Sequence, residues 1–230
     1  FGILQLLAAL FVSRKSSNGL TEILTDLRTM PKTMGQLAIV QFFTWLALFA
    51  MWIYSTSAIT SHVYGTSDPT SVAYNDGADW VGVLFGVYNG AAALFAFLLP
   101  VLAKWTSRKM THSISLIIGG LGLCSIFLIK DPVLLIIPFI GIGLAWSSIL
   151  SMPYAILTGS LPQTKMGVYM GIFNFFIVIP QILAATILGF MTKNLFGGEA
   201  VYALIFGGVC MIIAAITVYF VVDPDDKKQV

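Results

Sequence analysis

The position of the charged residues constrains this chain more than any other feature. All 12 lysines and arginines and all 10 aspartates and glutamates lie between long apolar stretches, and none lies inside one. A stretch of about 20 apolar residues is long enough to cross a hydrocarbon layer of roughly 30 Å as a helix. We therefore predict an all-α, polytopic membrane protein with a bundle of six spans over residues 34–222. The six stretches are residues 34–59, 81–103, 111–129, 133–157, 167–191 and 200–222.

Composition agrees with this fold class and excludes a transmembrane barrel. Hydrophobic residues make up 58% of the chain and charged residues 10%, whereas about a quarter of the residues in soluble domains are charged. Backbone groups in lipid must bond internally, which leaves helices or closed barrels. Uninterrupted apolar runs of this length do not have the alternating pattern of barrel strands. Cys124 and Cys210 fall within predicted spans, where we expect packing roles instead of disulfide or metal bonds.

The segments outside the bundle suggest that the chain is part of a longer protein. Residues 1–12 are too short to span a membrane alone, and we interpret them as the tail of a preceding transmembrane helix. Residues 13–33 are a cytoplasmic linker, in which apolar residues of 20–28 recur at helical spacing opposite charged ones, as in an amphipathic surface helix. Such a helix either joins two membrane bundles or senses lipid or a partner. A central linker fits a transporter built from two six-helix halves, of which this chain is the second, with 223–230 as its cytoplasmic tail.

Loop charges predict the orientation of the spans. When the loops are assigned alternately to the two sides, ten basic residues fall on one side and only Lys130 and Lys193 on the other. Basic residues concentrate in cytoplasmic loops, so we predict that both termini are cytoplasmic and that the loop at 61–79 lies outside. We expect a multi-pass protein of the cell membrane. The ten basic residues on the predicted cytoplasmic side are Arg14, Lys15, Arg28, Lys32, Lys104, Arg108, Lys109, Lys165, Lys227 and Lys228.

Large polar side chains inside apolar spans call for a separate explanation, since helices in lipid need only small residues to pack. In the first span Gln41, Trp45, Trp52 and Ser55 fall within a narrow sector at 3.6 residues per turn. Amides bond hydroxyl groups and aromatic faces cover C–H surfaces, so this stripe suits a sugar. The alternative is interfacial anchoring by the tryptophans, which fits Trp52 better than Trp45.

The second and fifth spans also carry amides. Tyr88 and Asn89 lie near the middle of the second span beside several glycines, where we expect close helix packing and a buried amide that needs partners. Asn174 and Gln181 share a face of the fifth span, and Pro180 removes a backbone donor just before Gln181. For any one of these residues, hydrogen bonding between helices is as good an explanation as substrate contact.

The fourth span completes the set of interior polar residues. Ser147, Ser151 and Tyr154 share one face, with Trp146 and Pro153 beside it. Amides and aromatics on four of the six helices favour a wet cavity between the helices over simple packing. The substrate-binding residues that we predict are Gln41, Trp45, Tyr88, Asn89, Trp146, Asn174 and Gln181.

Sequence motifs of enzymes and metal sites are absent. The sequence has no Cys-x-x-Cys, no G-x-x-x-x-G-K-[ST] loop and no acidic residue at membrane depth, so we expect no catalysis, no cofactor and no metal. His62 and His112 lie at the edges of spans, where we expect a loop or headgroup role. Positive-inside placement already explains Lys104, Arg108 and Lys109, so we expect no nucleic-acid binding.

Four segments together resemble a known family. Residues 99–109, LPVLAKWTSRK, resemble the second-half copy of the short basic loop of the major facilitator superfamily, although Lys104 stands where that loop usually has Asp. Residues 41–52 (QFFTWLALFAMW), 145–154 (AWSSILSMPY) and 171–181 (GIFNFFIVIPQ) are similar to the C-terminal half of the sugar:cation symporters related to plant sucrose carriers and animal proton-coupled sugar transporters. The resemblance covers nearly the whole chain.

The resemblance implies an alternating-access carrier that moves a disaccharide or related glycoside with protons. Its expected partners are the sugar, protons or sodium, membrane lipid and an N-terminal six-helix half. The alternatives are a non-transporting receptor or structural subunit on the same fold, and a sodium-coupled carrier of another small polar solute. Asp79 stands at the outer mouth of the second span, too close to water for a midplane ion site, so we expect the coupling carboxylate in the N-terminal half.

Overall fold

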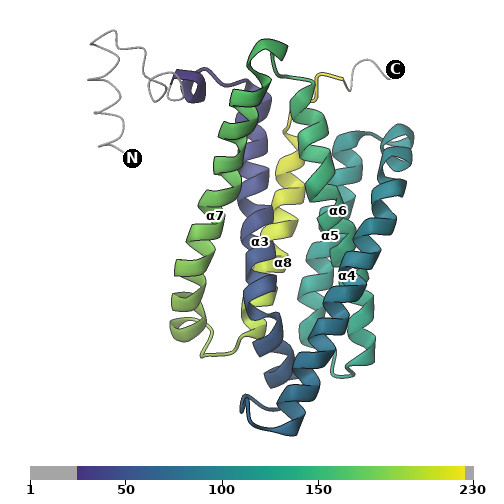
Figure 1. The fold of residues 1–230 in the computed structure, drawn as a ribbon, viewed down its shortest axis with the longest axis vertical. Helices are drawn as coiled ribbons and strands as arrows, with labels where there is room; N and C mark the ends of the chain where they lie inside the picture. Colours follow the sequence, from purple (N-terminus) through teal and green to yellow (C-terminus); the bar gives the residue numbers. More distant parts are fainter. Residues whose placement is uncertain (1–24, 226–230) are drawn as a thin grey trace, which may run out of the picture.

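The computed structural model describes residues 25–225, and this part of the chain is an all-helical bundle without strands (Figure 1). The predicted fold class is therefore confirmed. The predicted helix tail at 1–12, the linker residues 13–24 and the tail residues 226–230 lie outside the described residues. The elements are α3 (Lys32–His62), α4 (Val72–Trp105), α5 (Arg108–Ser125), η1 (Ile126–Leu128), η2 (Val133–Leu135), α6 (Ile136–Thr158), η3 (Gln163–Lys165), α7 (Met166–Asn194) and α8 (Val201–Tyr219).

Six of these elements are long and apolar enough to cross a membrane. The largest difference from the predicted spans is at α4, which begins at Val72, so the predicted loop at 61–79 is half helical. The reason is a helix cap that hydropathy does not detect. The Ser71 hydroxyl accepts a hydrogen bond from the backbone N–H of Tyr74 at 3.2 Å, which satisfies a free donor of the first turn. Asp79 consequently lies within the helix, on an exposed position.

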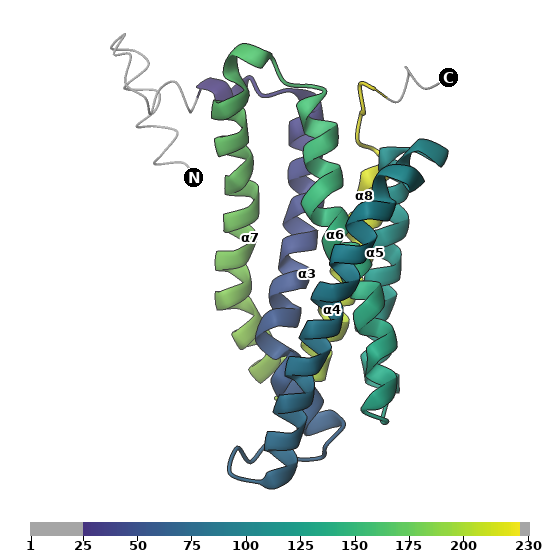
Figure 2. The same cartoon turned by 45° about the vertical axis from the view of Figure 1, so that its right-hand side comes forward.

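The helices form a central group with two flanking members. The central group is α3, α5, α6 and α8, in which α8 packs on α3 and α5, and α6 packs on α5. The flanking helix α4 packs mainly on α6 and α7 mainly on α3 (Figures 1 and 2). Only 28% of the apolar window of α4 and 17% of that of α7 are buried, against 50% or more in α3, α6 and α8. One face of each flanking helix is therefore uncovered within the described chain.

Glycine permits the closest helix contacts. A Cβ atom on Gly143 of α6 would lie 2.5 Å from the carbonyl oxygen of Tyr88 in α4. A Cβ atom on Gly208 of α8 would lie 2.6 Å from the carbonyl oxygen of Gly120 in α5. Small residues let helix backbones approach closely where lipid provides no hydrophobic driving force. The first contact brings α4 against α6 at the level of Tyr88.

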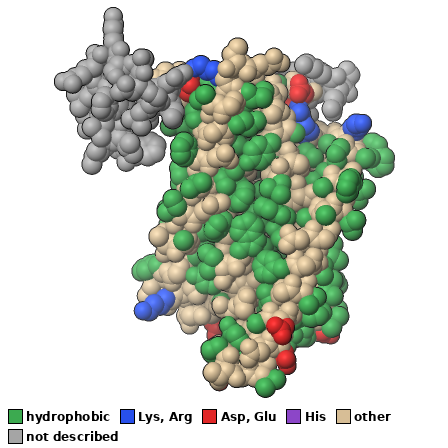
Figure 3. Space-filling model, viewed as in Figure 1, with side chains coloured by type: hydrophobic (Ala, Val, Ile, Leu, Met, Phe, Trp, Pro, Cys, Tyr) green, Lys and Arg blue, Asp and Glu red, His purple; other side chains and the backbone are tan. Residues whose placement is uncertain are grey.

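On the face shown in Figure 3, charged side chains gather at the two ends of the bundle. We call the end with Lys104, Arg108 and Lys165 the basic end, and the other, where Asp68 and Asp79 lie, the opposite end. The described linker residues meet the basic end, where the Lys165 ammonium lies 2.7 Å from an Asp26 carboxylate oxygen. The predicted amphipathic helix at 20–28 lies mostly outside the described residues and stays a prediction.

The residues after α8 are bound to the bundle at the basic end. We call residues 220–225 the C-terminal strap. The Thr33 hydroxyl donates to the carbonyl of Val222 at 2.7 Å, and the Gln36 amide bonds the strap backbone twice, at 2.7 and 2.9 Å. The Lys109 ammonium donates to the carbonyl of Val221 at 3.0 Å. The strap thus joins the starts of α3 and α5 to the end of α8.

Arg108 extends this network to α6. Its Nε and Nη2 atoms donate to the two carboxylate oxygens of Asp223, at 2.9 and 2.5 Å, and Nη2 also lies 2.9 Å from Asp225. Its Nη1 atom donates to the carbonyl of Ala155 at 2.9 Å. The Asp223 side chain is only 1% exposed, so the bidentate arginine compensates a buried charge.

Candidate functional site

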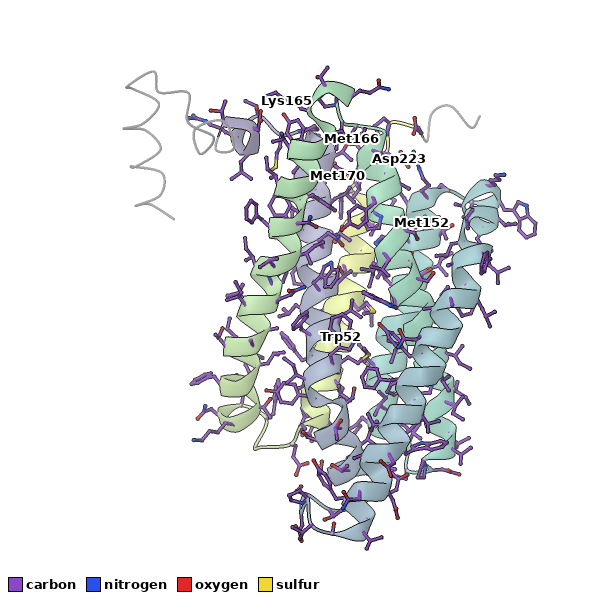
Figure 4. The ribbon with its side chains drawn as sticks, in the orientation of Figure 1. Trp52, Met152, Lys165, Met166, Met170 and Asp223 are labelled. Carbon is purple, nitrogen blue, oxygen red and sulfur yellow. The ribbon has the colours of Figure 1, made fainter. Side chains whose placement is uncertain are left out.

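Three tryptophans meet near the middle of the bundle, where Figure 4 labels Trp52. Trp45 and Trp52 come from α3 and Trp146 from α6. Their ring centroids are 6.2 Å apart for Trp45 and Trp52, 5.8 Å for Trp45 and Trp146, and 5.4 Å for Trp52 and Trp146. All three pairs are edge to face, which is a favoured arrangement of aromatic rings. We call these residues the tryptophan triad.

Tyr88 brings a third helix to the triad. Its ring stacks on Trp146 at a centroid distance of 6.3 Å and an interplanar angle of 26°. The side chain is 2% exposed. Because Gly143 allows α6 to approach the backbone of Tyr88, the two rings lie at the same level. The site is therefore built from α3, α4 and α6.

Several buried polar atoms on the three helices that build the site have no hydrogen-bond partner within residues 25–225. They include Gln41 Nε2, Trp45 Nε1, Tyr88 Oη and Ser147 Oγ. The Tyr88 hydroxyl lies near the Trp52 indole without completing a hydrogen bond of normal geometry. A buried polar group without a partner costs about 1–3 kcal/mol, and such groups are few in native proteins. These unpaired groups and the buried or half-buried aromatic rings together have the chemistry to bind a polar solute.

The structure brings together only part of the predicted set. Trp45, Tyr88 and Trp146 lie in this cluster, and Gln41 lies one turn before Trp45 on the same face of α3. The amides Asn174 and Gln181 lie on α7, Asn174 exposed and Gln181 half-buried. Because α7 packs on α3 and makes no comparable contact with α4 or α6, its amides line the outside of the described site. Their role in binding stays a prediction.

The expectation that Asn89 is a buried amide is wrong. Asn89 is exposed on the uncovered face of α4, and its Nδ2 atom donates to the backbone carbonyl of Phe85 at 2.8 Å. One position separates it from Tyr88, but one residue turns a helix by 100°, which moves the side chain to another face. Gly82, Gly86 and Gly90 have open space around them on the same helix.

One further residue belongs to the site although it is not in the predicted set. Trp52 completes the triad, and its spacing of seven residues from Trp45 is the signal that places both on one face. Ser147 follows Trp146 on α6, is 6% exposed and has a hydroxyl without a partner among the described residues. No periodic signal distinguishes Ser147 from the neighbouring Ser148, whose hydroxyl is bonded.

The expected loop or headgroup role of His112 is wrong. It lies in the second turn of α5 but is 0% exposed, and its Nδ1 atom is 2.8 Å from the hydroxyl oxygen of Ser148. Position along a helix does not determine which face is covered by neighbours, and this face meets α6. His62, in contrast, is half-buried at the end of α3, with Nε2 2.8 Å from the carbonyl of Phe127 and 2.9 Å from the Lys130 ammonium.

The chemistry of the site is neutral. No Asp, Glu, Lys or Arg lies in α3 or α6 between their end turns, and Asp79, the nearest charged residue of α4 to Tyr88, is nine positions before it along the helix. Among the described residues, no group of three or more His, Cys, Asp or Glu side chains can hold a metal ion. The groups that remain at the site are indoles, a phenol, an amide and a hydroxyl. Groups of these kinds recognise an uncharged polar solute through stacking and hydrogen bonds.

Comparison with protein families identifies the family of this chain. The family model described as Major Facilitator Superfamily matches residues 37–230, which include nearly all of α3 and every helix after it. Comparison with curated proteins gives no match. The match covers most of the chain and agrees with six apolar helices of membrane-spanning length. This chain therefore belongs to the Major Facilitator Superfamily and is a multi-pass membrane protein of the secondary-transporter type.

Proposed function

We propose that the chain is part of a secondary active carrier for a neutral sugar, a disaccharide or glycoside, moved together with protons. The observation that supports the sugar is the group of unpaired buried polar atoms beside the tryptophan triad. Sugars present hydroxyl groups and apolar C–H faces at once, so they use both hydrogen-bonding groups and aromatic rings. The absence of charged side chains around the triad favours a neutral solute.

The basic end is proposed to face the cytoplasm of a cell-membrane protein. The support is the positive-inside rule, applied to Lys104, Arg108, Lys109 and Lys165 at that end. In full-length protein, a cysteine replacing Asn75 should be modified by an impermeant reagent from outside, and one replacing Ser107 should not. The reverse pattern would overturn the orientation.

The proposed partner is a second six-helix half, in a complete transporter surrounded by lipid. The uncovered faces of α4 and α7 support this proposal, because binding sites of such carriers lie near the midplane between two repeats. Asn89, Asn174 and Gln181 lie on these two helices and would face the shared cavity. The coupling carboxylate is assigned to the other half, since Asp79 is exposed at the opposite end.

Sugar binding by purified full-length protein tests the proposal. A disaccharide that binds beside the triad should change its tryptophan fluorescence, and Trp146→Phe should remove most of that change. Trp105→Phe is the matched control, because Trp105 is 78% exposed at the end of α4. An equal loss in both variants, or binding of other polar solutes with no response to any sugar, would contradict the proposal.

Transport assays separate the carrier from its alternatives. Proteoliposomes with full-length protein should accumulate sugar when the inside is made alkaline, and a sodium gradient alone should not drive uptake. Binding without exchange would indicate a receptor on the same fold. Uptake driven by a sodium gradient would identify sodium, not the proton, as the coupling ion.

A further inference from the structure

His112 is a buried ionisable side chain that the sugar site does not use. It is 0% exposed between α5 and α6, and its Nδ1 atom lies 2.8 Å from the Ser148 hydroxyl oxygen. Its Nε2 atom is also buried and has no hydrogen-bond partner among the residues that the structure describes. Ser148 follows Ser147 and Trp146 along α6. The hydrogen bond to Ser148 thus connects His112 to α6, the helix that contributes Trp146 to the site.

The surroundings of His112 provide no counter-charge for a proton. On α6 and α8 the chain has no Asp, Glu, Lys or Arg. Both strap carboxylates at this end are bound by Arg108, which is one turn before His112 on α5. Neither is bonded to the imidazole. The titratable groups on the elements around α5 at this end are Arg108, Lys109, Lys104, Tyr154, Tyr219, Asp223 and Asp225.

We propose that His112 is a proton-binding site of this bundle, and that its protonation favours the separation of α5 from α6 at the basic end. In the arrangement described here the imidazole is neutral and Ser148 bonds one nitrogen. When the helices separate, water reaches Nε2, and the imidazole accepts a proton from hydronium in that water, which leaves an imidazolium and a water molecule. Closing the helices again requires that the proton returns to water, because a buried charge without a partner is strongly unfavourable.

The consequence is a bundle whose opening at one end depends on pH. A ligand shifts a conformational equilibrium only by binding one state better than the other, and a proton binds the hydrated imidazole better than the buried one. Acidification should therefore populate the arrangement that is open at the basic end. The inference rests on the proposed carrier only in assuming that this end opens, and it is tested without any sugar.

The test measures access to α6 by alkylation of purified full-length protein in detergent. Cys124 and Cys210 are replaced by Ala, and a cysteine is introduced by Ser151→Cys, half-buried one turn beyond Ser147. Thr158→Cys, exposed at the end of α6, serves as the reference for the titration of the thiol itself. The ratio of the two alkylation rates should rise severalfold from about pH 8 to about pH 5.5, the range in which histidine titrates.

Two variants separate proton binding from simple packing. His112→Gln keeps a side chain that can bond Ser148 but cannot titrate in this range, so its ratio should be independent of pH. Ser148→Ala keeps the imidazole and removes its partner, so its ratio should be higher at both pH values and still rise on acidification. A pH response that persists in His112→Gln would overturn the proposal, as would a flat wild-type ratio. If His112→Gln does not fold, the alkylation ratio of His112→Asn is measured instead, and it should also be independent of pH.

Discussion

Buried polar groups are paired in the Arg108 network at the basic end and unpaired in the aromatic middle of the bundle. At the basic end, the Asp223 carboxylate is 1% exposed and accepts two hydrogen bonds from Arg108. In the middle, Gln41 is 0% exposed and its Nε2 atom has no partner in the described part of the chain. Buried polar groups are normally paired. The comparison indicates that the network at the basic end stabilises the fold, whereas the unpaired polar atoms in the middle are available to bond the solute that we propose.

The largest expected effect comes from breaking the network at the basic end. Arg108→Gln leaves the buried Asp223 carboxylate uncompensated, which should lower the free energy of unfolding by about 3 kcal/mol. Thermal unfolding of the full-length protein in detergent measures the change. Lys104→Gln is the control, because Lys104 is an exposed cation at the same end. Equal unfolding temperatures for the two variants would show that the bonds between Arg108 and Asp223 do not stabilise the fold.

The next effect tests how closely α4 must approach α6. In Gly143→Ala the new Cβ atom would lie 2.5 Å from the Tyr88 carbonyl oxygen and 2.9 Å from Ala91 Cβ, so the helices must move apart. We expect a loss of about 1–3 kcal/mol of stability and weaker sugar binding, since Tyr88 leaves Trp146.

The matched control for that variant is Gly86→Ala. No atom of the described chain lies within 4 Å of a Cβ atom placed there, and alanine favours a helix over glycine by roughly 1 kcal/mol. Stability in detergent should stay the same or rise. A loss equal to that of Gly143→Ala would mean that the close contact with Tyr88 does not control the response.

Removing an unpaired polar atom should separate stability from binding. Tyr88→Phe deletes a buried hydroxyl with no partner, so stability should not fall. Sugar binding should weaken by about 0.5–1.5 kcal/mol if the solute uses that hydroxyl. Isothermal titration with purified protein measures the second quantity. Lower stability with unchanged affinity would mean that the Tyr88 hydroxyl stabilises the fold, as Arg108 does at the basic end, and does not bind the sugar.

The amides on α7 give a smaller test of the same comparison. Asn174→Ala and Gln181→Ala should each weaken sugar binding by about 0.5–1.5 kcal/mol, because one hydrogen bond to a neutral hydroxyl is lost. Expression and membrane insertion should be normal, since neither side chain is fully buried. Unchanged affinity in both variants would assign these amides to packing between helices.

The smallest effect concerns a carboxylate at the opposite end. The backbone N–H of Thr70, at 2.9 Å, and its hydroxyl, at 2.7 Å, donate to Asp68 Oδ1 and lower the pKa of that carboxyl. A lowered pKa contributes stability above the unfolded value of 3.8, which is lost as pH falls through the folded pKa. Asp68→Asn should unfold at a slightly lower temperature than wild type near pH 6, and this difference should disappear near about pH 2. A difference that is the same at both pH values would mean that the loop does not stabilise the charged form.

Hydropathy and spacing are local properties, so they predicted much of this molecule. Six spans follow from uncharged stretches whose length matches the bilayer, and six helices of that length are present. The spacing of seven residues between Trp45 and Trp52 placed both on one face, and both rings meet Trp146. These features depend only on helix geometry and on the properties of the residues themselves.

Only the tertiary structure decided which face of each helix is covered. Spans that are apolar all round have no periodic signal for their buried side, so Asn89 was expected inside but is exposed, and His112 was expected to meet a loop or headgroups but is buried. The bond between Arg108 and Asp223 joins residues 115 positions apart, which no local pattern can predict. Helix faces in a membrane bundle are set by the neighbours they meet, because lipid and protein interior are equally apolar.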